Sequence, residues 1–357
     1  MERNGRPLQP TLRDVARRAQ VSVQTISRVV NNKGEVAEET RQRVLTAIDE
    51  LGYRPNALAR SLVTRASSVI GLVVPDIAQP FYPEIARGVE DEAYLAGFSV
   101  FLCHIAGDPR RERQALERLR DHRVAGVIIC NSRLDDAILA RMVADLSPVV
   151  LVNRDLPNVS GTVIWPGYDT GGGLAVEHLL AIGRRRIAYL GLDEANQADQ
   201  GKRRGYRLAL ERAGLPVDPQ RVLGVSDTFY GGYEALARLA TEGVDVDGIF
   251  AFNDLMAIGA MRYAATHGIA VPTDVAIVGF GGSEVASMVT PALSTIEVPL
   301  YTIGTTAVQE LLDLIKVGGL ERRQVHSEPR LVIRGSSLVG GLPVQRVALG
   351  EDGRQEV

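Results

Sequence analysis

Apolar residues recur at helical spacing through the first fifty positions of this chain. The spacing predicts helices over Leu12–Ala19, Val23–Asn31 and Glu38–Leu51, with a tight turn at Gln20–Ser22 between the first two. The second helix would turn a row of polar side chains outward. Such a helix fits the major groove of DNA and can read base edges there. The pattern therefore predicts a helix-turn-helix head.

Beyond residue 68, short apolar runs alternate with amphipathic segments. Repeated strand–helix units imply parallel sheets with helices on both faces, and two successive series predict two doubly wound lobes of an α/β body. A further strand, helix and strand follow the second series. The predicted strands are 69–74, 99–104, 126–130, 148–153, 186–191, 222–225, 248–252, 275–280, 293–297 and 329–333, and the predicted helices are 83–96, 109–121, 134–146, 170–182, 202–213, 230–241, 255–267 and 301–317.

The head resembles that of the lactose/galactose repressor (LacI/GalR) family of transcriptional regulators. Weaker family marks continue to about residue 338, so the resemblance covers nearly the whole chain. The motifs that carry it are Asp14-Val15-Ala16, Val21-Ser22, Thr25-Ile26-Ser27-Arg28-Val29, Val36, Thr40-Arg41 and Leu51-Gly52-Tyr53-Arg54-Pro55-Asn56-Ala57-Leu58-Ala59-Arg60-Ser61-Leu62. The resemblance implies a repressor whose affinity for a palindromic operator is controlled by a small molecule, and a homodimer.

The resemblance also implies a domain plan. The body would look like a periplasmic sugar-binding protein, with a cleft between two lobes that are joined by three crossovers. The crossovers are expected near Ile164–Gly167, Val298–Leu300 and Glu328–Arg330. The expected parts are a head over 1–54, a hinge helix and linker over 55–67, a body over 68–340 and a polar tail over 341–357. Within the body, one lobe would take about 68–165 and 300–328, and the other about 166–298 and 329–340.

DNA contacts follow from the same resemblance. Base reading falls to Val23, Gln24 and Arg28, since an arginine can fork onto guanine and a glutamine can pair with adenine. Hydroxyls, amides and helix N-termini would hold phosphates and fix the register. Leu62 would wedge into a base step of the minor groove. The expected phosphate contacts are Thr11, Ser22, Thr25, Ser27 and Asn31, and Asn56 and Ala59 would bring the hinge helix close to the groove.

Effector contacts are expected on loops at the carboxyl ends of the strands. The chain departs from the family's sugar-responsive members, which usually carry an arginine at the position of Lys202 and an aspartate at that of Gly281. An aromatic residue is frequent where Asp227 stands, and an aspartate where Trp165 stands. The candidate contacts are Phe81, Tyr82, Asn131, Asn153, Arg154, Trp165, Lys202, Asp227, Asn253 and Gly281.

These departures leave the class of effector open. Lys202 and Arg154, facing each other across the cleft, would favour an anionic ligand such as a sugar acid. Asp227 acts in the opposite direction, because a carboxylate can hold a hydroxyl or an amine. A neutral sugar and a cationic or nucleoside-like ligand therefore remain alternatives to an anion.

Charge is unevenly spread along the 357 residues. The net charge is −3 overall, +5 over residues 1–65 and −8 over the remainder. A basic head on an acidic body suits phosphate binding. The first fourteen residues have no apolar stretch typical of a signal peptide, and no apolar run reaches membrane-spanning length. We expect a cytoplasmic protein with no membrane partner.

Other classes of protein find little support in the sequence. Gly279-Phe280-Gly281-Gly282 follows a strand but lacks the spacing of a dinucleotide-binding turn, and no nucleophile motif or metal set is present. We expect no enzyme and no cofactor, with Cys103 and Cys130 as reduced core residues. The alternative is a sugar-type binding protein without a DNA role, and the basic head argues against it. The tail has no leucine heptad, so a dimer is preferred to a tetramer.

Overall fold

A computed structural model describes residues 10–30, 34, 36–53, 67–146, 148–156, 159–193, 196–318 and 322–338. The chain divides into two compact units, Met1–Ser67 and Ser68–Val357. Four residues expected at the DNA, Asn31, Asn56, Ala59 and Leu62, lie outside the described residues. No helix of the described part is long and apolar enough to cross a bilayer.

In the described part of the first unit the chain forms three helices: α1 (Leu12–Ala19), α2 (Val23–Val30) and α3 (Glu38–Leu51). Helices of eight residues are marginal alone, so a shared core must stabilise α1 and α2. That core is formed by Val15, Ala16, Ala19, Ile26, Val29, Val44, Ala47 and Tyr53. At the start of α1, the backbone N–H of Thr11 donates to the Asp14 carboxylate at 2.9 Å, which closes a capping box.

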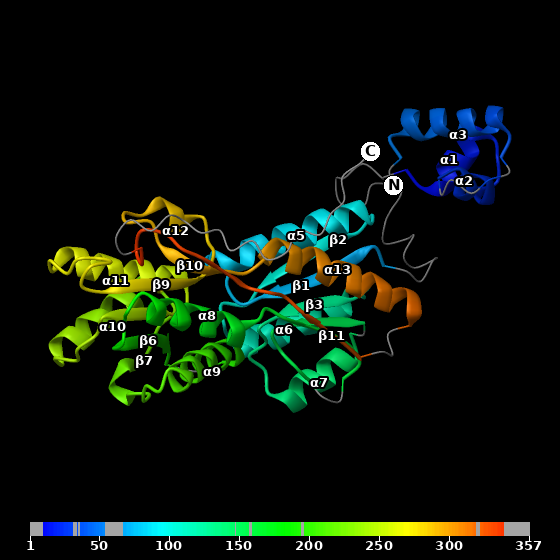
Figure 1. Cartoon of the computed structure of the whole chain (residues 1–357). Coiled ribbons are helices and arrows are strands. Elements are labelled where there is room, and N and C mark those ends of the chain that lie inside the picture. The colour runs from blue at the N-terminus through cyan, green and yellow to red at the C-terminus, as the bar shows by residue number, and fades with distance from the viewer. Residues whose placement is uncertain are drawn as a thin grey trace, which may run out of the picture. The chain divides into compact units, whose positions relative to one another are not determined.

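The N-lobe of the body is built on a six-stranded parallel sheet (Figure 1). The strand order is β11-β5-β4-β3-β1-β2, so its last strand along the chain lies at one edge and β2 at the other. Helices α5 and α13 cover one face, and α6 and α7 cover the other. The elements are β1 (Val69–Val74), α5 (Phe81–Leu95), β2 (Ser99–His104), α6 (Pro109–Asp121), β3 (Val127–Cys130), α7 (Asp136–Ala144), β4 (Val149–Val152), β5 (Gly161–Trp165), α13 (Leu300–Val317) and β11 (Arg322–His326).

The C-lobe repeats this plan with the strand order β12-β10-β9-β8-β6-β7. Strand β12 pairs antiparallel with β10, and the other pairs are parallel. Helices α8 and α9 cover one face, and α10 and α11 cover the other. The elements are α8 (Tyr168–Ala181), β6 (Ile187–Leu192), α9 (Gln197–Arg212), η1 (Pro219–Arg221), β7 (Val222–Val225), α10 (Phe229–Thr241), β8 (Gly248–Ala251), α11 (Asp254–Thr266), β9 (Ala276–Gly281), α12 (Val285–Met288), β10 (Ser294–Glu297) and β12 (Arg330–Val332).

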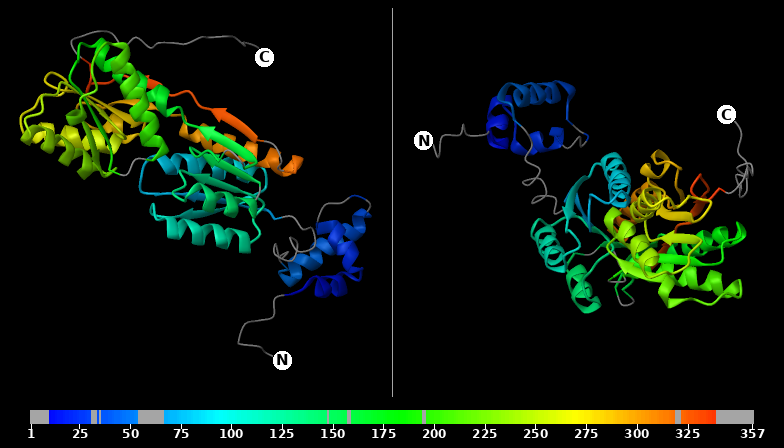
Figure 2. Two further views of the ribbon diagram at one scale, coloured as in Figure 1. Left: turned by 90° about the horizontal axis from the view of Figure 1, so that it is seen from below. Right: turned by 90° about the vertical axis from the view of Figure 1, so that its left-hand side faces the viewer.

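The chain crosses between the lobes three times, from β5 to α8, from β10 to α13 and from β11 to β12. Figure 2 shows the two lobes of the body with the last crossover running along both of them. One apolar cluster, which includes Ile164 of the N-lobe and Ile296 of the C-lobe, continues through both. The body is therefore two sheets that share part of their core.

Several elements differ from the sequence expectations. Strands β5 and β11 were not predicted. In β11 (Arg322–His326), exposed polar side chains alternate with partly buried ones at a sheet edge, so the strand has no apolar run. Helix α9 begins at Gln197 instead of Lys202, because the Asn196 side chain caps it by accepting from the backbone N–H of Asp199 at 2.9 Å. The second sheet is mixed, and not wholly parallel as expected.

Candidate effector site and DNA-binding head

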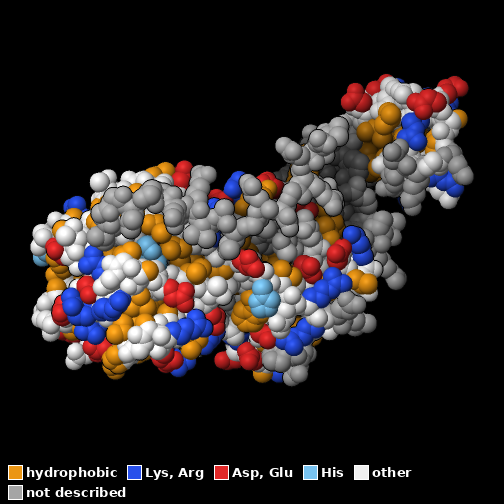
Figure 3. Space-filling view, viewed as in Figure 1, with side chains coloured by type: hydrophobic (Ala, Val, Ile, Leu, Met, Phe, Trp, Pro, Cys, Tyr) orange, Lys and Arg blue, Asp and Glu red, His pale blue; other side chains and the backbone are white. Residues whose placement is uncertain are grey.

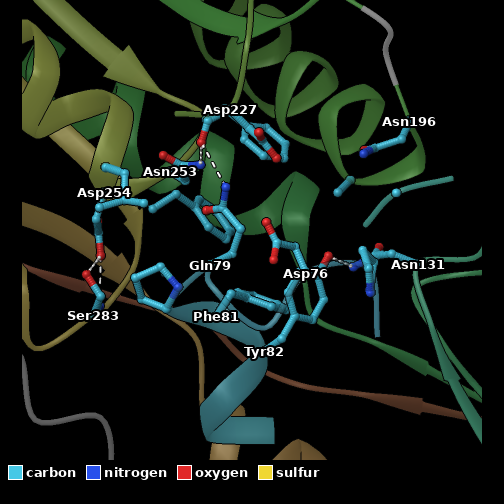
Figure 4. A pocket seen from close by; sticks show the side chains of 18 of the residues that line it. Asp76, Gln79, Phe81, Tyr82, Asn131, Asn196, Asp227, Asn253, Asp254 and Ser283 are labelled. Carbon is cyan, nitrogen blue, oxygen red and sulfur yellow. Dashed lines mark hydrogen bonds between the residues drawn. The ribbon is translucent and has the colours of Figure 1, made fainter. Parts of the chain in front are cut away.

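A cavity of about 270 Å³ opens between the two lobes of the body, at the carboxyl ends of the strands. Both lobes supply its walls (Figure 4). The N-lobe contributes Asp76, Gln79, Phe81, Tyr82, Asn131 and Arg133, and the C-lobe contributes Tyr168, Asn196, Lys202, Asp227, Phe252, Asn253, Asp254, Phe280, Gly281 and Ser283.

An aromatic and amide cluster forms the N-lobe wall. Phe81 and Tyr82 begin α5 and pack edge to face, with ring centroids 5.3 Å apart. Asn131 donates from Nδ2 to the Tyr82 hydroxyl at 2.9 Å, and its Oδ1 accepts from Asn153. Both asparagines have positive φ, a conformation that asparagine tolerates better than most residues. Burial raises the pKa of Tyr82, so its hydroxyl stays protonated and can donate to a ligand.

Lys202 is enclosed by aromatic rings. Its Nζ donates to the carbonyl oxygen of Phe252 at 2.9 Å. The same nitrogen lies 3.7 Å from the ring centroid of Phe252, 4.0 Å from that of Phe280 and 4.8 Å from that of Tyr168. Only 4% of the residue is exposed. Burial lowers the pKa of Lys202 to about 7, although nearby aspartates oppose the shift. This amine is held against the C-lobe and is not a freely extended cation.

The Asp254 carboxylate is hydrogen-bonded to other residues of the C-lobe wall. Its carboxylate accepts from the backbone N–H and the hydroxyl of Ser283, each at 2.7 Å, and from the Thr295 hydroxyl at 2.5 Å. Burial raises the pKa of Asp254, and these hydrogen bonds oppose the rise. Gly281 lies beside it with φ +130°, which a side chain rarely adopts. Asp254 thus fixes the loop after β9 and leaves space in front of Gly281.

Asp227 joins the two lobes at the mouth of the cavity. Its backbone oxygen accepts from Gln79 Nε2 of the N-lobe at 3.3 Å and from Asn253 Nδ2 of the C-lobe at 2.8 Å (Figure 4). Burial raises the pKa of the Asp227 carboxyl, and the Arg133 guanidinium opposes the rise. Arg133 and Asp227 therefore face one cavity from opposite lobes with opposite charges.

Seven of the ten expected effector residues line this cavity: Phe81, Tyr82, Asn131, Lys202, Asp227, Asn253 and Gly281. Three do not. Asn153 lies behind Asn131, and Trp165 packs against the core beneath α6 and α7. Arg154 donates to the carbonyl of Leu134 at 2.8 Å and pairs with Asp136 of α7 at 2.5 Å. The expectation that Arg154 faces Lys202 is wrong, because its guanidinium turns toward α7.

Sequence reasoning missed a second set of cavity residues. Arg133 lies two positions beyond Asn131, and Asp76 lies two positions beyond β1. Both could have been found by the rule that placed the other residues on the loops after strands. Tyr168, Phe252 and Phe280 carried no such signal, because they read as core aromatics. The missed residues are Asp76, Gln79, Arg133, Tyr168, Asn196, Phe252 and Phe280.

Helix α2 of the head presents the expected base-reading residues. Val23, Gln24 and Arg28 are exposed, while Ile26 and Val29 anchor the helix. At its N-terminus, the backbone N–H of Thr25 donates to the Ser22 hydroxyl at 3.1 Å. Ser27 is exposed on the same helix, and Thr11 begins α1. An exposed polar face beside two helix N-termini can meet bases and phosphates together.

A helix-turn-helix head and a two-lobed body with an interlobe cavity define a transcriptional regulator with a periplasmic-binding-protein-like body. Residues 11–56 match the model described as bacterial regulatory proteins of the lacI family. Residues 67–334 match the model of periplasmic binding proteins and the sugar-binding domain of the LacI family. The chain belongs to the LacI family.

Known proteins support the assignment along nearly the whole chain. The transcriptional regulator RegA of Clostridium saccharobutylicum is 35% identical over 334 residues, covering 92% of this chain and 99% of the relative. The ribose operon repressor of Halalkalibacterium halodurans is also 35% identical, with coverages of 92% and 98%. The Lac repressor dimer bound to operator and the anti-inducer ONPF is 29% identical, with a TM-score of 0.84 and coverages of 92% and 99%. These relatives are regulators and not enzymes.

Proposed function

We propose that this regulator is a repressor whose affinity for a palindromic operator is set by a small polyhydroxylated molecule bound between the lobes. One observation carries the proposal: the cavity is walled by both lobes, and Gln79 of one donates to Asp227 of the other. A ligand that contacts both walls changes the relative free energies of open and closed lobes. A dimer can transmit that change to two heads.

The charges in the cavity favour a neutral ligand over an anion. Asp76 and Asp227 face it with Arg133, while Asp254 and Lys202 are already engaged by protein groups. A hydroxyl can donate to a carboxylate and accept from a guanidinium, so a polyol suits this mixed set. An acid would meet two carboxylates for one available guanidinium. The relative named a ribose operon repressor agrees with a sugar-like effector.

Matched neutral and acidic sugars test the ligand class. Titration calorimetry with D-ribose against D-ribonate, and with glucose against gluconate, should favour the neutral partner of each pair. Asp227→Asn should weaken the neutral ligand by about tenfold, since one charge-assisted hydrogen bond contributes about 1.5–3 kcal/mol. Tighter binding of the acids by the wild type would overturn the neutral assignment.

The DNA contacts are assigned from the head. Val23, Gln24 and Arg28 would read bases, and Thr11, Ser22, Thr25, Ser27 and Asn31 would hold phosphates. Leu62, with Asn56 and Ala59, would open the minor groove at the centre of the site. Selection of binding sites from random DNA should return a palindrome, because two heads related by a two-fold axis meet two half-sites. An asymmetric single site would contradict the assignment.

A second copy of the chain has a surface to dock on in the N-lobe. Tyr94 and Leu95 at the end of α5 are 78% and 80% exposed, and Leu102 on the edge strand β2 is 48% exposed on the face of the sheet that α5 covers. We call these three residues the α5–β2 patch. Apolar residues gathered on adjacent elements commonly mark protein interfaces. Elsewhere, the face of the body in Figure 3 carries acidic and basic side chains intermixed.

A further inference from the structure

Lysine is almost absent from this protein. Of the 40 basic residues only three are lysines, Lys33, Lys202 and Lys316, and the others are arginines. One of the three stands in the wall of the effector cavity. An arginine supplies a permanent charge and no nucleophile at ordinary pH, whereas a buried lysine can supply a free amine. Among the residues that line the cavity, Lys202 is therefore the one that can supply a free amine.

The surroundings of Lys202 favour the unprotonated amine. Its one hydrogen-bond acceptor is the neutral carbonyl of Phe252, and no carboxylate of the described residues lies within ion-pair distance of Nζ. Asp199 is occupied by Arg203, Tyr189 and the backbone N–H of Leu192. Burial without an adjacent counter-ion disfavours the ammonium, so the pKa of about 7 leaves much of the amine free at neutral pH.

The three aromatic rings suit a cation that is formed in place. The faces of Tyr168, Phe252 and Phe280 surround Nζ and attract positive charge. A protonated imine on Nζ would keep its charge between these faces. The protein therefore accommodates both the free amine and the cationic product of its reaction with a carbonyl group.

Asp227 lines the same cavity as Lys202 and its charge acts on the Lys202 ammonium together with those of Asp199 and Asp254. It lies outside ion-pair distance of Nζ, so protons would pass between the two groups through a water molecule or a hydroxyl of the effector. Burial raises the pKa of the Asp227 carboxyl, and in the described structure its own backbone N–H is the hydrogen-bond donor to it. Asp254 is engaged by Ser283 and Thr295, which leaves Asp76 and Asp227 as the other carboxyl groups of the cavity, and of these two Asp227 is the one whose charge acts on Lys202.

We infer that Lys202 is a nucleophile that captures an aldehyde or ketone group of the effector as a reversible imine. The inference rests on the proposed effector site. Nζ attacks the carbonyl carbon, and one of its protons is carried by way of Asp227 to the carbonyl oxygen, which gives a neutral carbinolamine. A proton taken from water, again by way of Asp227, then lets the hydroxyl leave as water as the C=N bond forms. The sum is amine plus carbonyl plus one proton giving a protonated imine plus water, with no oxidation or reduction, and hydrolysis releases the effector.

Reductive trapping tests the inference on the full-length protein. The probe is glycolaldehyde, a two-carbon hydroxyaldehyde that fits the cavity, with cyanoborohydride to reduce any imine irreversibly. Peptide mass spectrometry then measures alkylation of each lysine between pH 6 and 10. Lys202 should react at least tenfold faster than Lys316 at pH 7, because burial lowers the pKa of Lys202 to about 7 while the Lys316 side chain is 75% exposed and pairs with Asp313. The Lys202 rate should level above pH 7.

Two variants distinguish the role of the nucleophile from the role of the proton donor. Asp227→Asn should slow alkylation of Lys202 about tenfold or more and leave Lys316 unchanged, since general acid catalysis contributes at least that much. Lys202→Arg keeps a cation and should abolish trapping in the cavity peptide. Wild-type Lys202 that stays unmodified, or that reacts no faster than Lys316 at pH 7, would overturn the inference and leave Lys202 as a structural cation.

A different result would contradict the proposed function of the effector site. If glycolaldehyde traps Lys202 but the trapped protein binds its selected operator unchanged, the result supports the reaction of the amine and contradicts the regulatory role of the site. If a neutral sugar changes operator binding while no carbonyl compound is trapped, the result supports the regulatory role and contradicts the imine.

Discussion

Lys202 should give the stability of the protein a recognisable dependence on pH. Its pKa is about 7 in the folded protein and near the ordinary value of 10.5 in the unfolded chain. Between these values the unfolded chain holds a proton that the folded protein lacks, so folding becomes more favourable as pH rises. The contribution is complete above 10.5 and is lost as pH falls through 7.

Comparison with Lys202→Met isolates this dependence. Between pH 7 and 10, the free energy of unfolding of the wild type should rise relative to the variant by up to about 1.4 kcal/mol for each pH unit. Denaturant unfolding at a series of pH values measures it. A constant difference between the two proteins across that range would show that Lys202 keeps its ordinary pKa.

Arg28 should help the head to distinguish one DNA sequence from another, while neighbouring charged residues should not. Arg28→Ala should weaken binding to the selected operator by about 1–3 kcal/mol, the contribution of a bidentate base contact, and change binding to random DNA little. Arg43, exposed on α3, supplies a control for loss of charge alone. Fluorescence anisotropy with both DNAs measures the ratio. Equal losses on the two DNAs would make Arg28 a phosphate contact.

Single residues also show where sequence reasoning stops. The strand-end rule found Asn131 and Asp227, because it needs only the order of elements. It could not choose between Arg133 and Arg154, which both follow strands of the N-lobe. Asp136 decides that choice by pairing with Arg154, and such a pairing depends on three-dimensional contacts that spacing does not contain.

At the scale of elements, glycines let α8 and α9 approach closely. A Cβ on Gly172 would lie 2.6 Å from the backbone oxygen of Lys202, and one on Gly205 would lie 2.2 Å from that of Asp169. A Cβ on Gly173, the next residue of α8, would meet only a side-chain oxygen of Glu177, at 4.0 Å. The same contact that joins the helices also positions the backbone of Lys202 beside the cavity.

Adjacent alanine substitutions should therefore have opposite effects. Gly172→Ala should destabilise the protein by about 1–3 kcal/mol through overpacking. Gly173→Ala should stabilise it by about 0.5–1 kcal/mol, because alanine favours the helix more than glycine does. Circular dichroism in denaturant gives both values. Similar effects of the two substitutions would mean that α8 and α9 separate easily.

Of the two strands that escaped prediction, β11 has a physical reason for it, whereas β5 is a buried strand of the sheet interior. Helices can be predicted from the periodic spacing of apolar residues, and central strands from apolar runs such as that of β3 (Val127–Cys130). Strand β11 follows a different rule, since its backbone pairs with β5 across more than a hundred residues while its side chains stay largely outside the core. Long-range pairing of an edge strand leaves little trace in local sequence.

At the scale of the whole molecule, the α5–β2 patch should control assembly. Leu102→Asp should convert the dimer to a monomer and weaken operator binding, because a buried carboxylate in an apolar interface has no partner. Leu208→Asp is the matched control, since Leu208 on α9 is 39% exposed outside the patch. Analytical ultracentrifugation measures both variants. A Leu102→Asp protein that stays dimeric would place the interface elsewhere.

The three crossovers also determine when each lobe can form during synthesis. The edge strand β11 and the covering helix α13 of the N-lobe lie after the strands β6 to β10 of the C-lobe in the chain. A ribosome that has released the first 165 residues has therefore delivered a sheet that still lacks one edge and half of one face. The N-lobe is complete only when β11 has emerged at residue 326, and the C-lobe when β12 has emerged at residue 332. The nascent N-lobe must hold an unfinished apolar surface in water while residues 166–326 are made, which makes it the natural target for a chaperone.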